Sequence, residues 1–488
     1  MKEKHNILMT FLFVLCIRTM ISTFINLNGE SFRQESNYTH ITGLSVENWY
    51  FEVMNKPSLK AYHSYLIGKT LTLYDPRWYD VNFSQESLEN LASLIRLNLL
   101  LGDLLVLFPA IYLWSRKFDE GMGEIFILFT TLSPSWVIVD WGLVKFTNIS
   151  LGLYMISIYF LLKNDFRKST VFFSLSIAYD QTQIYFLMPY LIYFPAKTLR
   201  RKNFANRIKV VEFFAQLIFH QVLLTGPFYK SFSRFLCSLY RNINYKLFTI
   251  ASANFWGLTH LIMNWNFLFS DSQLLVFGMI MPIFISLPAF IVLASNPKKI
   301  FFFYTNCITC ISFFLFSFQH DTSSIIFPLL ACFLNFKYEY NIAIWMSCIT
   351  PLGLYVALRI DSLLLPTMIL QLIHLSFLYF EVKIAMLFSG IVYNSVLFCI
   401  VLFVPLSLMT EFLVESREYH GVNAFAYGIM AISIVMQFTL LLIYFYVKLF
   451  QILLRYHRII SKNEKLSLRQ SFVRFVSTRF SGKFKSNK

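Results

Sequence analysis

The chain is poor in charged residues and in cysteines that could pair. Only 14% of its 488 residues are charged, whereas ordinary soluble domains carry about 25%, so a soluble fold could not hide this much apolar surface. The seven cysteines are an odd number and six of them lie in apolar runs, so no disulfide framework is implied. Cys307 and Cys310 have the spacing of half a metal site without a second half, and we interpret them as buried helix-packing thiols. The sequence therefore indicates neither a metal nor a cofactor.

The chain also lacks internal repeats and paired interrupted helices, which argues against an inverted-repeat transporter. Hydrophobic residues make up 57% of it, and they include 55 Phe. They recur in runs of roughly 20, each long enough to cross a bilayer as a helix. The runs are continuously apolar and do not alternate at period two, which favours helices over a barrel. The sequence predicts an all-α polytopic membrane protein.

The apolar runs predict about 14 transmembrane helices and a simple organisation of the chain. Residues 1–27 form a cytosolic N-terminus with the first helix, which we expect to be an uncleaved anchor because no small-x-small cleavage pattern follows it. Residues 28–90 form a large polar loop, 91–447 a multi-span bundle and 448–488 a basic tail. The predicted spans are 6–27, 93–114, 122–140, 147–163, 169–182, 184–197, 208–225, 273–295, 300–318, 323–336, 341–357, 362–380, 385–409 and 424–447.

The distribution of charge predicts the orientation. The net charge of +16 is concentrated in residues 448–488, where eleven Lys or Arg accompany one acid, Glu464. A basic segment directly after the last span is typical of a cytosolic tail near anionic lipid, so a bilayer partner is expected and a nucleic-acid partner is not. Both termini are then cytosolic, and the loop 28–90 lies on the opposite face. Two glycosylation sequons, at Asn37 and Asn82, fit that face.

Ordered fragments between about residue 29 and 330 carry a resemblance to a known family. The fragments are Trp49-Tyr50-Phe51, Ala61-Tyr62-His63-Ser64, Arg96 with Gly102-Asp103-Leu104-Leu105 and Pro109-Ala110, Ser150-Leu151-Gly152, Tyr179-x-Gln181 with Tyr185 and Pro189, Ala253-Asn254-Phe255-Trp256, and Leu315-Phe316-Ser317-Phe318-Gln319. In their order and spacing the chain resembles the dolichyl-phosphate-glucose-dependent α-1,3-glucosyltransferases of the endoplasmic reticulum, and more closely the enzyme that adds the first glucose.

The resemblance implies a GT-C fold whose first lumenal loop carries the catalytic carboxylate. It implies a dolichyl-phosphate-glucose donor, a dolichyl-diphosphate Man9GlcNAc2 acceptor, and transfer of glucose with inversion in N-glycan precursor assembly. Such a transfer needs one base for the attacking hydroxyl and polar or cationic groups for the leaving phosphate. The resemblance also implies an endoplasmic reticulum membrane setting with lumenal active-site loops.

The candidate general base is Glu30. Relatives carry Gly-Asp at the start of this loop, and aligning Gly29 places Glu30 at the position of the aspartate. Aligning on Phe32 would place Ser31 there, which is no base, and Glu35 is then the nearest fallback. A glutamate reaches one methylene further than an aspartate, and a misplacement of roughly 1 Å can cost about a hundredfold in rate.

Several motif positions implied in substrate binding are altered from the family pattern. Lys145 lies where relatives carry a Gly-His-Phe-Gln-Tyr-Asn stretch, and Asp180 replaces a lysine. A lysine is also absent after the pair His320 and Asp321, and Arg241 is one of the cations that could compensate. The full set of candidate substrate-binding residues is Tyr62, His63, Gln181, Trp256, Gln319, His320, Asp321, Lys145 and Arg241.

Structural interpretations stand beside these functional ones. His63 either faces substrate or makes a structural hydrogen bond. Arg18 and Asp103 lie in apolar runs, where an ionisable group usually faces a cavity or a partner, and Arg96 is the expected partner of Asp103. At the level of the whole chain, the alternative is a catalytically impaired relative that binds the lipid donor or a membrane partner. A transporter or channel is the third hypothesis.

Overall fold

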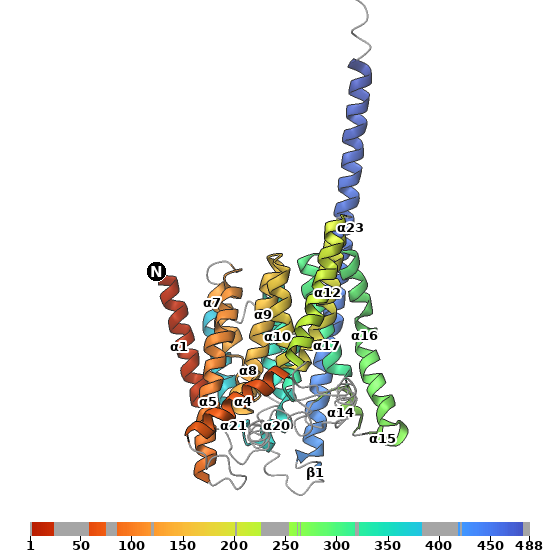
Figure 1. The fold of residues 1–488 in the computed structure, drawn as a ribbon. Coiled ribbons are helices and arrows are strands. Elements are labelled where there is room, and N and C mark those ends of the chain that lie inside the picture. The colour runs from red at the N-terminus through yellow and green to blue at the C-terminus, as the bar shows by residue number, and fades with distance from the viewer. Residues whose placement is uncertain are drawn as a thin grey trace, which may run out of the picture. The chain divides into compact units, whose positions relative to one another are not determined.

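The protein is almost entirely helical in the part that a computed structural model describes, which is residues 2–23, 58–74, 85–118, 122–200, 203–225, 253–260, 262–263, 265–317, 322–382, 418–419 and 422–481. Within these ranges the strands are β1 (Glu418–Tyr419) and β2 (Val422–Asn423), which pair antiparallel. Figure 1 shows many of the helices between residues 2 and 382 running alongside one another. The predicted helical class is confirmed.

The helical elements follow the apolar runs closely. Those of the first half are α1 (Lys2–Ser22), α4 (Ser58–Tyr74), α5 (Gln85–Gly102), η2 (Asp103–Leu107), α6 (Phe108–Ser115), α7 (Met122–Thr131), α8 (Pro134–Val137), η3 (Ile138–Gly142), α9 (Thr147–Leu162), α10 (Phe166–Tyr179), η4 (Gln181–Phe186), α11 (Leu187–Leu199) and α12 (Phe204–Thr225). The second half contains α14 (Phe255–His260), α15 (Trp265–Leu268), α16 (Asp271–Ser295), α17 (Lys299–Phe316), η6 (Thr322–Ile325), α18 (Ile326–Leu334), α19 (Phe336–Gly353), α20 (Tyr355–Ile360), α21 (Leu364–Val382) and α23 (Ala424–Ser481).

Several of these helices can cross a membrane, which makes the chain a multi-pass membrane protein. Four described helices are long and apolar enough to do so alone: Leu91–Ser115, Ser272–Ser295, Lys299–Phe316 and Gly428–Tyr456. The bent pair Met122–Thr131 and Pro134–Gly142 makes a fifth if it counts as one span. Other predicted spans form shorter helices, such as α9 with 16 residues and α18 with 9. The number of fourteen therefore stays a prediction, and its span 385–409 lies outside the described residues.

The break between α7 and α8 follows from the sequence. A residue that precedes proline is driven out of the α region, and Ser133 before Pro134 has φ −56° and ψ 121°. The two helices are bent by 46° at this point. The Thr131 carbonyl at the end of α7 accepts hydrogen bonds from Arg18 Nη2 at 2.8 Å and Arg18 Nε at 3.3 Å. A charged side chain of α1 thus satisfies backbone at the helix break.

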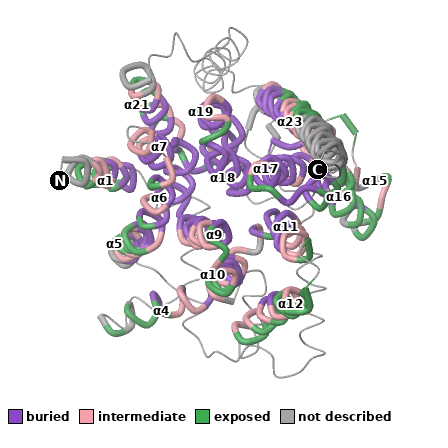
Figure 2. The backbone as a smooth tube through the Cα atoms, turned by 90° about the horizontal axis from the view of Figure 1, so that it is seen from above, coloured by how far each residue is buried: buried purple, intermediate pink, exposed green. Residues whose placement is uncertain are grey.

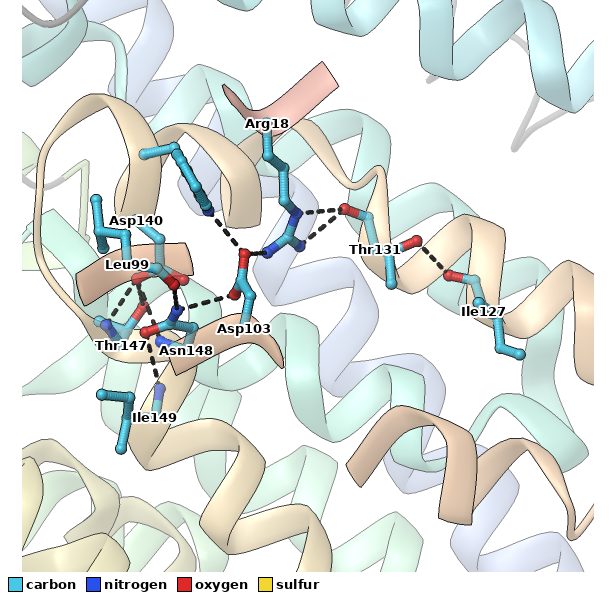
Figure 3. A network of polar contacts seen from close by, with 10 residues as sticks. Arg18, Leu99, Asp103, Ile127, Thr131, Asp140, Thr147, Asn148 and Ile149 are labelled. Carbon is cyan, nitrogen blue, oxygen red and sulfur yellow. Dashed lines mark hydrogen bonds and ion pairs between the residues drawn. The ribbon is translucent and has the colours of Figure 1, made fainter. Parts of the chain in front are cut away.

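Arg18 belongs to a buried polar network, drawn in Figure 3, that joins α1, η2, η3 and α9. Its Nη1 lies 2.7 Å from Asp103 Oδ2, and both side chains are 0% exposed. Asp103 also accepts hydrogen bonds from Trp141 Nε1 and Asn148 Nδ2, both at 2.8 Å. Both carboxylate oxygens of Asp103 therefore bond to side chains of other helical elements and hold these elements together.

The expected pairing of Asp103 with Arg96 is wrong, because Arg18 is the partner. Seven residues separate Arg96 from Asp103 on one helical face, which corresponds to a rise of about 10.5 Å. That distance is too long for a direct ion pair, whereas α1 brings Arg18 to the level of the carboxylate. Arg96 Nε instead donates to the Ser22 carbonyl at 3.1 Å.

The helices with the longest buried stretches, α17 and α18, lie in the second half of the sequence, whereas the residues of this network lie in the first half. Figure 2 shows α17 and α18 largely in the colour of buried residues, whereas α12 and α16 carry many exposed ones. Every residue of α18 is buried. Exposed apolar side chains such as Phe284 and Ile291 on α16 are those expected of a helix that faces lipid.

Close packing between α9 and η2 depends on a glycine. A Cβ atom on Gly152 would lie 2.9 Å from Val106 Cγ1 and 3.1 Å from the Leu107 Cα atom. Backbone atoms cannot move aside as a flexible side-chain end can, so this position admits only glycine at the observed separation. The contact fixes where α9 begins, and with it the segment that precedes α9.

The chain divides into two compact units, Met1–Thr439 and Leu440–Lys488. Helix α23 continues without interruption beyond its candidate span Gly428–Tyr456. The second unit is therefore helical through Ser481. The segment 448–488 that the sequence marks as a basic tail is thus mostly helix.

Candidate functional site

Helix α4 carries the Ala61-Tyr62-His63-Ser64 motif and packs against α10. His63 Nδ1 and the Tyr179 hydroxyl are hydrogen-bonded at 2.9 Å across 116 residues of sequence. The His63 ring also meets the Phe146 ring edge-on, with centroids 5.3 Å apart. Three motif segments that are distant in sequence therefore converge on one imidazole. Figure 1 shows α4 passing close to α10 in the lower half of the bundle, on the same side as α14.

The segment that contains Lys145 is held in an unusual backbone conformation. Val144 and Phe146 have φ values of 55° and 56°, in the left-handed region that non-glycine residues seldom adopt. Strain of this kind persists only where neighbouring groups fix it. Here the Lys145 carbonyl accepts a hydrogen bond from Lys60 Nζ at 3.0 Å, and Lys60 lies 5.8 Å from the Phe146 ring centre.

The other end of this segment is fixed by Asp140. Its Oδ1 accepts from the Thr147 backbone N at 2.6 Å, the Thr147 hydroxyl at 2.7 Å and the Asn148 backbone N at 3.2 Å. These contacts cap the beginning of α9, where unpaired N–H groups otherwise remain. Because Asn148 also bonds to Asp103, the buried network of Figure 3 is continuous with the backbone of the Lys145 segment.

Asp180, which stands where relatives carry lysine, has a local structural role. Its Oδ1 accepts hydrogen bonds from the backbone N and from the hydroxyl of Thr182. It thereby caps η4, the short helix that contains Gln181. A carboxylate at a helix N-terminus is favourable, whereas a lysine could not accept these bonds. The backbone of Gln181 thus begins η4, two residues after Tyr179, although its side chain is outside what the structure describes.

Trp256 and Asn254 belong to a second motif cluster, at the end of α17. Trp256 is 6% exposed, and its Nε1 donates to the Phe316 carbonyl at 2.8 Å. Asn254 Nδ2 donates to the Ser317 carbonyl at 3.1 Å. The indole N–H of Trp256 is therefore used to attach α14 to α17, and any contact with substrate is left to the ring.

Tyr185 links the two motif clusters. It follows Asp180 on η4, stacks on Phe313 of α17 with ring centroids 5.0 Å apart, and is hydrogen-bonded to the Ser317 side chain. Ser317 is also the residue whose carbonyl holds Asn254. The described fragments around Tyr185, Ser317 and Asn254 are thus connected.

The predicted site residues divide into three groups. Tyr62, His63 and Lys145 lie together, and Gln181 is in the adjoining helix η4. Trp256 lies in the second cluster. Burial raises the pKa of the Tyr62 hydroxyl. The remaining candidates are outside the described residues: Glu30, Glu35, Arg241, Gln319, His320 and Asp321.

Sequence reasoning missed Lys60, whose Nζ donates to the Lys145 carbonyl in the strained segment. Lys60 and His63 are three residues apart, so they share a face once residues 58–74 are seen to form a helix. Within the described ranges, no three His, Cys, Asp or Glu side chains are grouped as metal ligands.

Comparisons with known proteins match most of this chain. The family described as the ALG6, ALG8 glycosyltransferase family matches residues 36–447. A probable dolichyl pyrophosphate Man9GlcNAc2 alpha-1,3-glucosyltransferase of Drosophila melanogaster is 26% identical over 401 residues, covering 76% of this chain and 83% of the relative. The protein of that name from Saccharomyces cerevisiae is 27% identical over 354 residues, which are 66% of this chain and 63% of the relative. A probable one of Dictyostelium discoideum is 25% identical over 397 residues, or 75% and 76% of the two chains.

Proposed function

We propose that this chain, which belongs to the ALG6, ALG8 glycosyltransferase family, transfers glucose from dolichyl-phosphate-glucose to a dolichyl-diphosphate-linked Man9GlcNAc2 oligosaccharide with inversion. The observation that carries the proposal is the convergence of α4, the Lys145 segment and α10 on His63. The printed names of the relatives support the acceptor and the α-1,3 linkage. The donor is inferred from the family resemblance of the motifs.

The chemistry asks for a base and for groups that accept negative charge. In the proposed step, an acceptor hydroxyl oxygen attacks C1 of glucose, and the C1–O bond to the lipid phosphate breaks with its electron pair leaving on the phosphate oxygen. Glu30 takes the proton of the hydroxyl, with Glu35 as the second candidate. Lys60 and Lys145 are the cations of the described site that would oppose the charge on the leaving phosphate.

His63 is the positioning residue of this proposal. Its Nδ1 is committed to Tyr179, so the ring has a fixed orientation. In this orientation the imidazole would position a sugar hydroxyl or a phosphate oxygen. The two interpretations of His63, a structural hydrogen bond and a substrate-facing ring, are then compatible.

The proposed setting is the endoplasmic reticulum membrane. The α4 end of the bundle would be lumenal and both termini cytosolic, as the positive-inside rule requires. In this organisation residues 28–90 carry the base, 91–447 form the bundle and 448–488 lie in the cytosol.

Microsomes that contain the protein, supplied with labelled dolichyl-phosphate-glucose and the Man9 lipid acceptor, test the proposal. We expect glucose to enter the acceptor, and Glu30→Gln to reduce incorporation at least about a hundredfold. Glu35→Gln is the matched variant: a loss confined to Glu35→Gln would transfer the role of base to that residue. An acceptor that already carries one glucose separates addition of the first glucose from addition of the second.

The same assay addresses the non-catalytic alternative. A folded, membrane-inserted wild-type protein that incorporates no glucose into either acceptor would refute the proposal. Retention of labelled donor by that inactive protein would instead favour a donor-binding relative.

A further inference from the structure

Four lysines gather at the helix ends that lie away from His63. Lys117 follows α6, Lys163 follows α9, Lys197 is in the last turn of α11, and Lys299 begins α17. α9 begins next to Phe146 and runs for 16 residues, about 24 Å, before it reaches Lys163. This group, here called the lysine cluster, is therefore separate from the site proposed for sugar transfer.

Lys117 is half-buried, and its ammonium group is the buried part. Its Nζ has no hydrogen-bond partner among the residues that the structure describes. It lies 4.5 Å from the centre of the Trp114 ring and 4.6 Å from that of Tyr159. The Nζ of Lys163 lies 4.4 Å from the same Tyr159 ring. Two ammonium groups thus share one aromatic ring, which offsets only part of their lost hydration.

The described contacts of Lys197 bring no negative charge to the cluster. Lys197 Nζ donates to Asn164 Oδ1 at 2.7 Å and to the Tyr193 hydroxyl at 3.2 Å, both neutral groups. Asp165, the acid next to Asn164, pairs with Lys168 outside the cluster at 3.0 Å. Asp119 and Glu120, which follow Lys117 in sequence, lie outside the described residues.

The charges of the lysine cluster act on one another. Burial, then Lys299 and Lys163, lower the pKa of Lys117 to about 7. Burial and Lys299 also lower the pKa of Lys197. Buried like charges without an anion are costly, and an anion placed between them removes that cost. Lys163 and Lys299 are exposed, so a ligand can reach the cluster from outside.

We infer that the lysine cluster (Lys117, Lys163, Lys197 and Lys299) is a binding site for a phosphate group at the membrane surface, with the buried Lys117 Nζ at its innermost point. Lysines bind phosphate as point charges, and four of them surpass the charge of one phosphate. The phosphate would come from the headgroup of an anionic phospholipid or from a free phosphate ion. The site lies in the headgroup region on the face opposite α4, since each lysine flanks an apolar helix.

The test uses the full chain in phosphatidylcholine nanodiscs and measures the midpoint of thermal unfolding. One arm adds inorganic phosphate, and the other replaces part of the phosphatidylcholine with phosphatidylglycerol in phosphate-free buffer. A ligand that binds the native state raises the midpoint, so we expect at least one arm to raise it. A rise with phosphatidylglycerol alone identifies a headgroup site, and a rise with phosphate alone identifies a free-ion site.

Lys163→Gln/Lys299→Gln is the test variant, and we expect it to reduce the rise at least about twofold. Arg167→Gln/Lys168→Gln is the matched control: it removes the same charge from exposed residues outside the cluster, which pair with Glu212 and Asp165. The inference is overturned if neither arm raises the wild-type midpoint, or if the test and control variants respond alike. If the double variant does not fold, Lys117→Gln replaces it as the test variant. It too must lose the rise in the midpoint of thermal unfolding.

Discussion

Replacing Asp103 by leucine would leave the Arg18 guanidinium charged and unpaired inside the bundle. Both side chains are 0% exposed at a separation of 2.7 Å, and removal of one partner of such a buried pair costs about 3–5 kcal/mol. The Trp141 and Asn148 donors would lose their acceptor as well, so we expect the upper part of this range. Arg18 keeps its two hydrogen bonds to the Thr131 carbonyl, which cannot neutralise its charge.

The measurement is the free energy of unfolding in mixed micelles, taken from titration with a denaturing detergent. Arg18→Met/Asp103→Leu removes both charges, and we expect it to be more stable than Asp103→Leu because no buried charge is left unpaired. The matched control is the pair Arg167 and Glu212, also 2.7 Å apart but with side chains 78% and 35% exposed. Removing this exposed ion pair through Arg167→Ala should lower the free energy of unfolding by less than about 1 kcal/mol. If Asp103→Leu lowers the free energy of unfolding no more than Arg167→Ala does, then burial does not make the Arg18–Asp103 pair more important for stability than an exposed pair, and the prediction is refuted.

Three further predictions concern other parts of the molecule. We expect Tyr179→Phe, which removes the hydroxyl bonded to His63, to lower glucose transfer less than His63→Ala does, and equal losses would mean that the imidazole acts only through this hydrogen bond. Gly152→Ala should destabilise the protein by about 1–3 kcal/mol because backbone of η2 opposes the new Cβ, whereas Gly142→Ala, which meets the end of the Leu363 side chain, should cost less; detergent unfolding compares them. Lys117→Gln, in phosphatidylcholine and phosphate-free buffer, should stabilise the protein more at pH 6 than at pH 9. Burial lowers the pKa of Lys117 to about 7, so the unfolded chain binds the extra proton between pH 7 and the ordinary lysine value, and wild-type stability rises with pH over that window. An equal gain at the two pH values would show that folding does not lower the pKa of Lys117.

The positions of the helices were largely predictable from the sequence. The runs 273–295 and 300–318 correspond to α16 (Asp271–Ser295) and α17 (Lys299–Phe316), because a continuous apolar stretch in lipid must satisfy its backbone as a helix. α4 was not predicted, since residues 58–74 mix polar and apolar side chains and were taken as part of a loop. Its helical form is what makes Lys60 and His63 neighbours.

The membership of the candidate site was only partly predictable. His63 and Lys145 were proposed from motif fragments, but the bond between His63 and Tyr179 joins residues 116 apart, and no local pattern indicates such a contact. The change from a cation to Asp180 suggested a weakened phosphate site. The structure gives it a local reason, because the carboxylate caps η4. The role of Glu30 stays a prediction from the family resemblance.

Composition and periodicity determined that this chain enters a membrane as helices and which end of each helix carries positive charge, since hydration energies act on every residue locally. Tertiary structure alone decided that Arg18 and not Arg96 neutralises Asp103, that His63 meets Tyr179, and that four lysines from separate helices share one region. Those outcomes depend on distances between helices, which packing sets and no segment contains by itself.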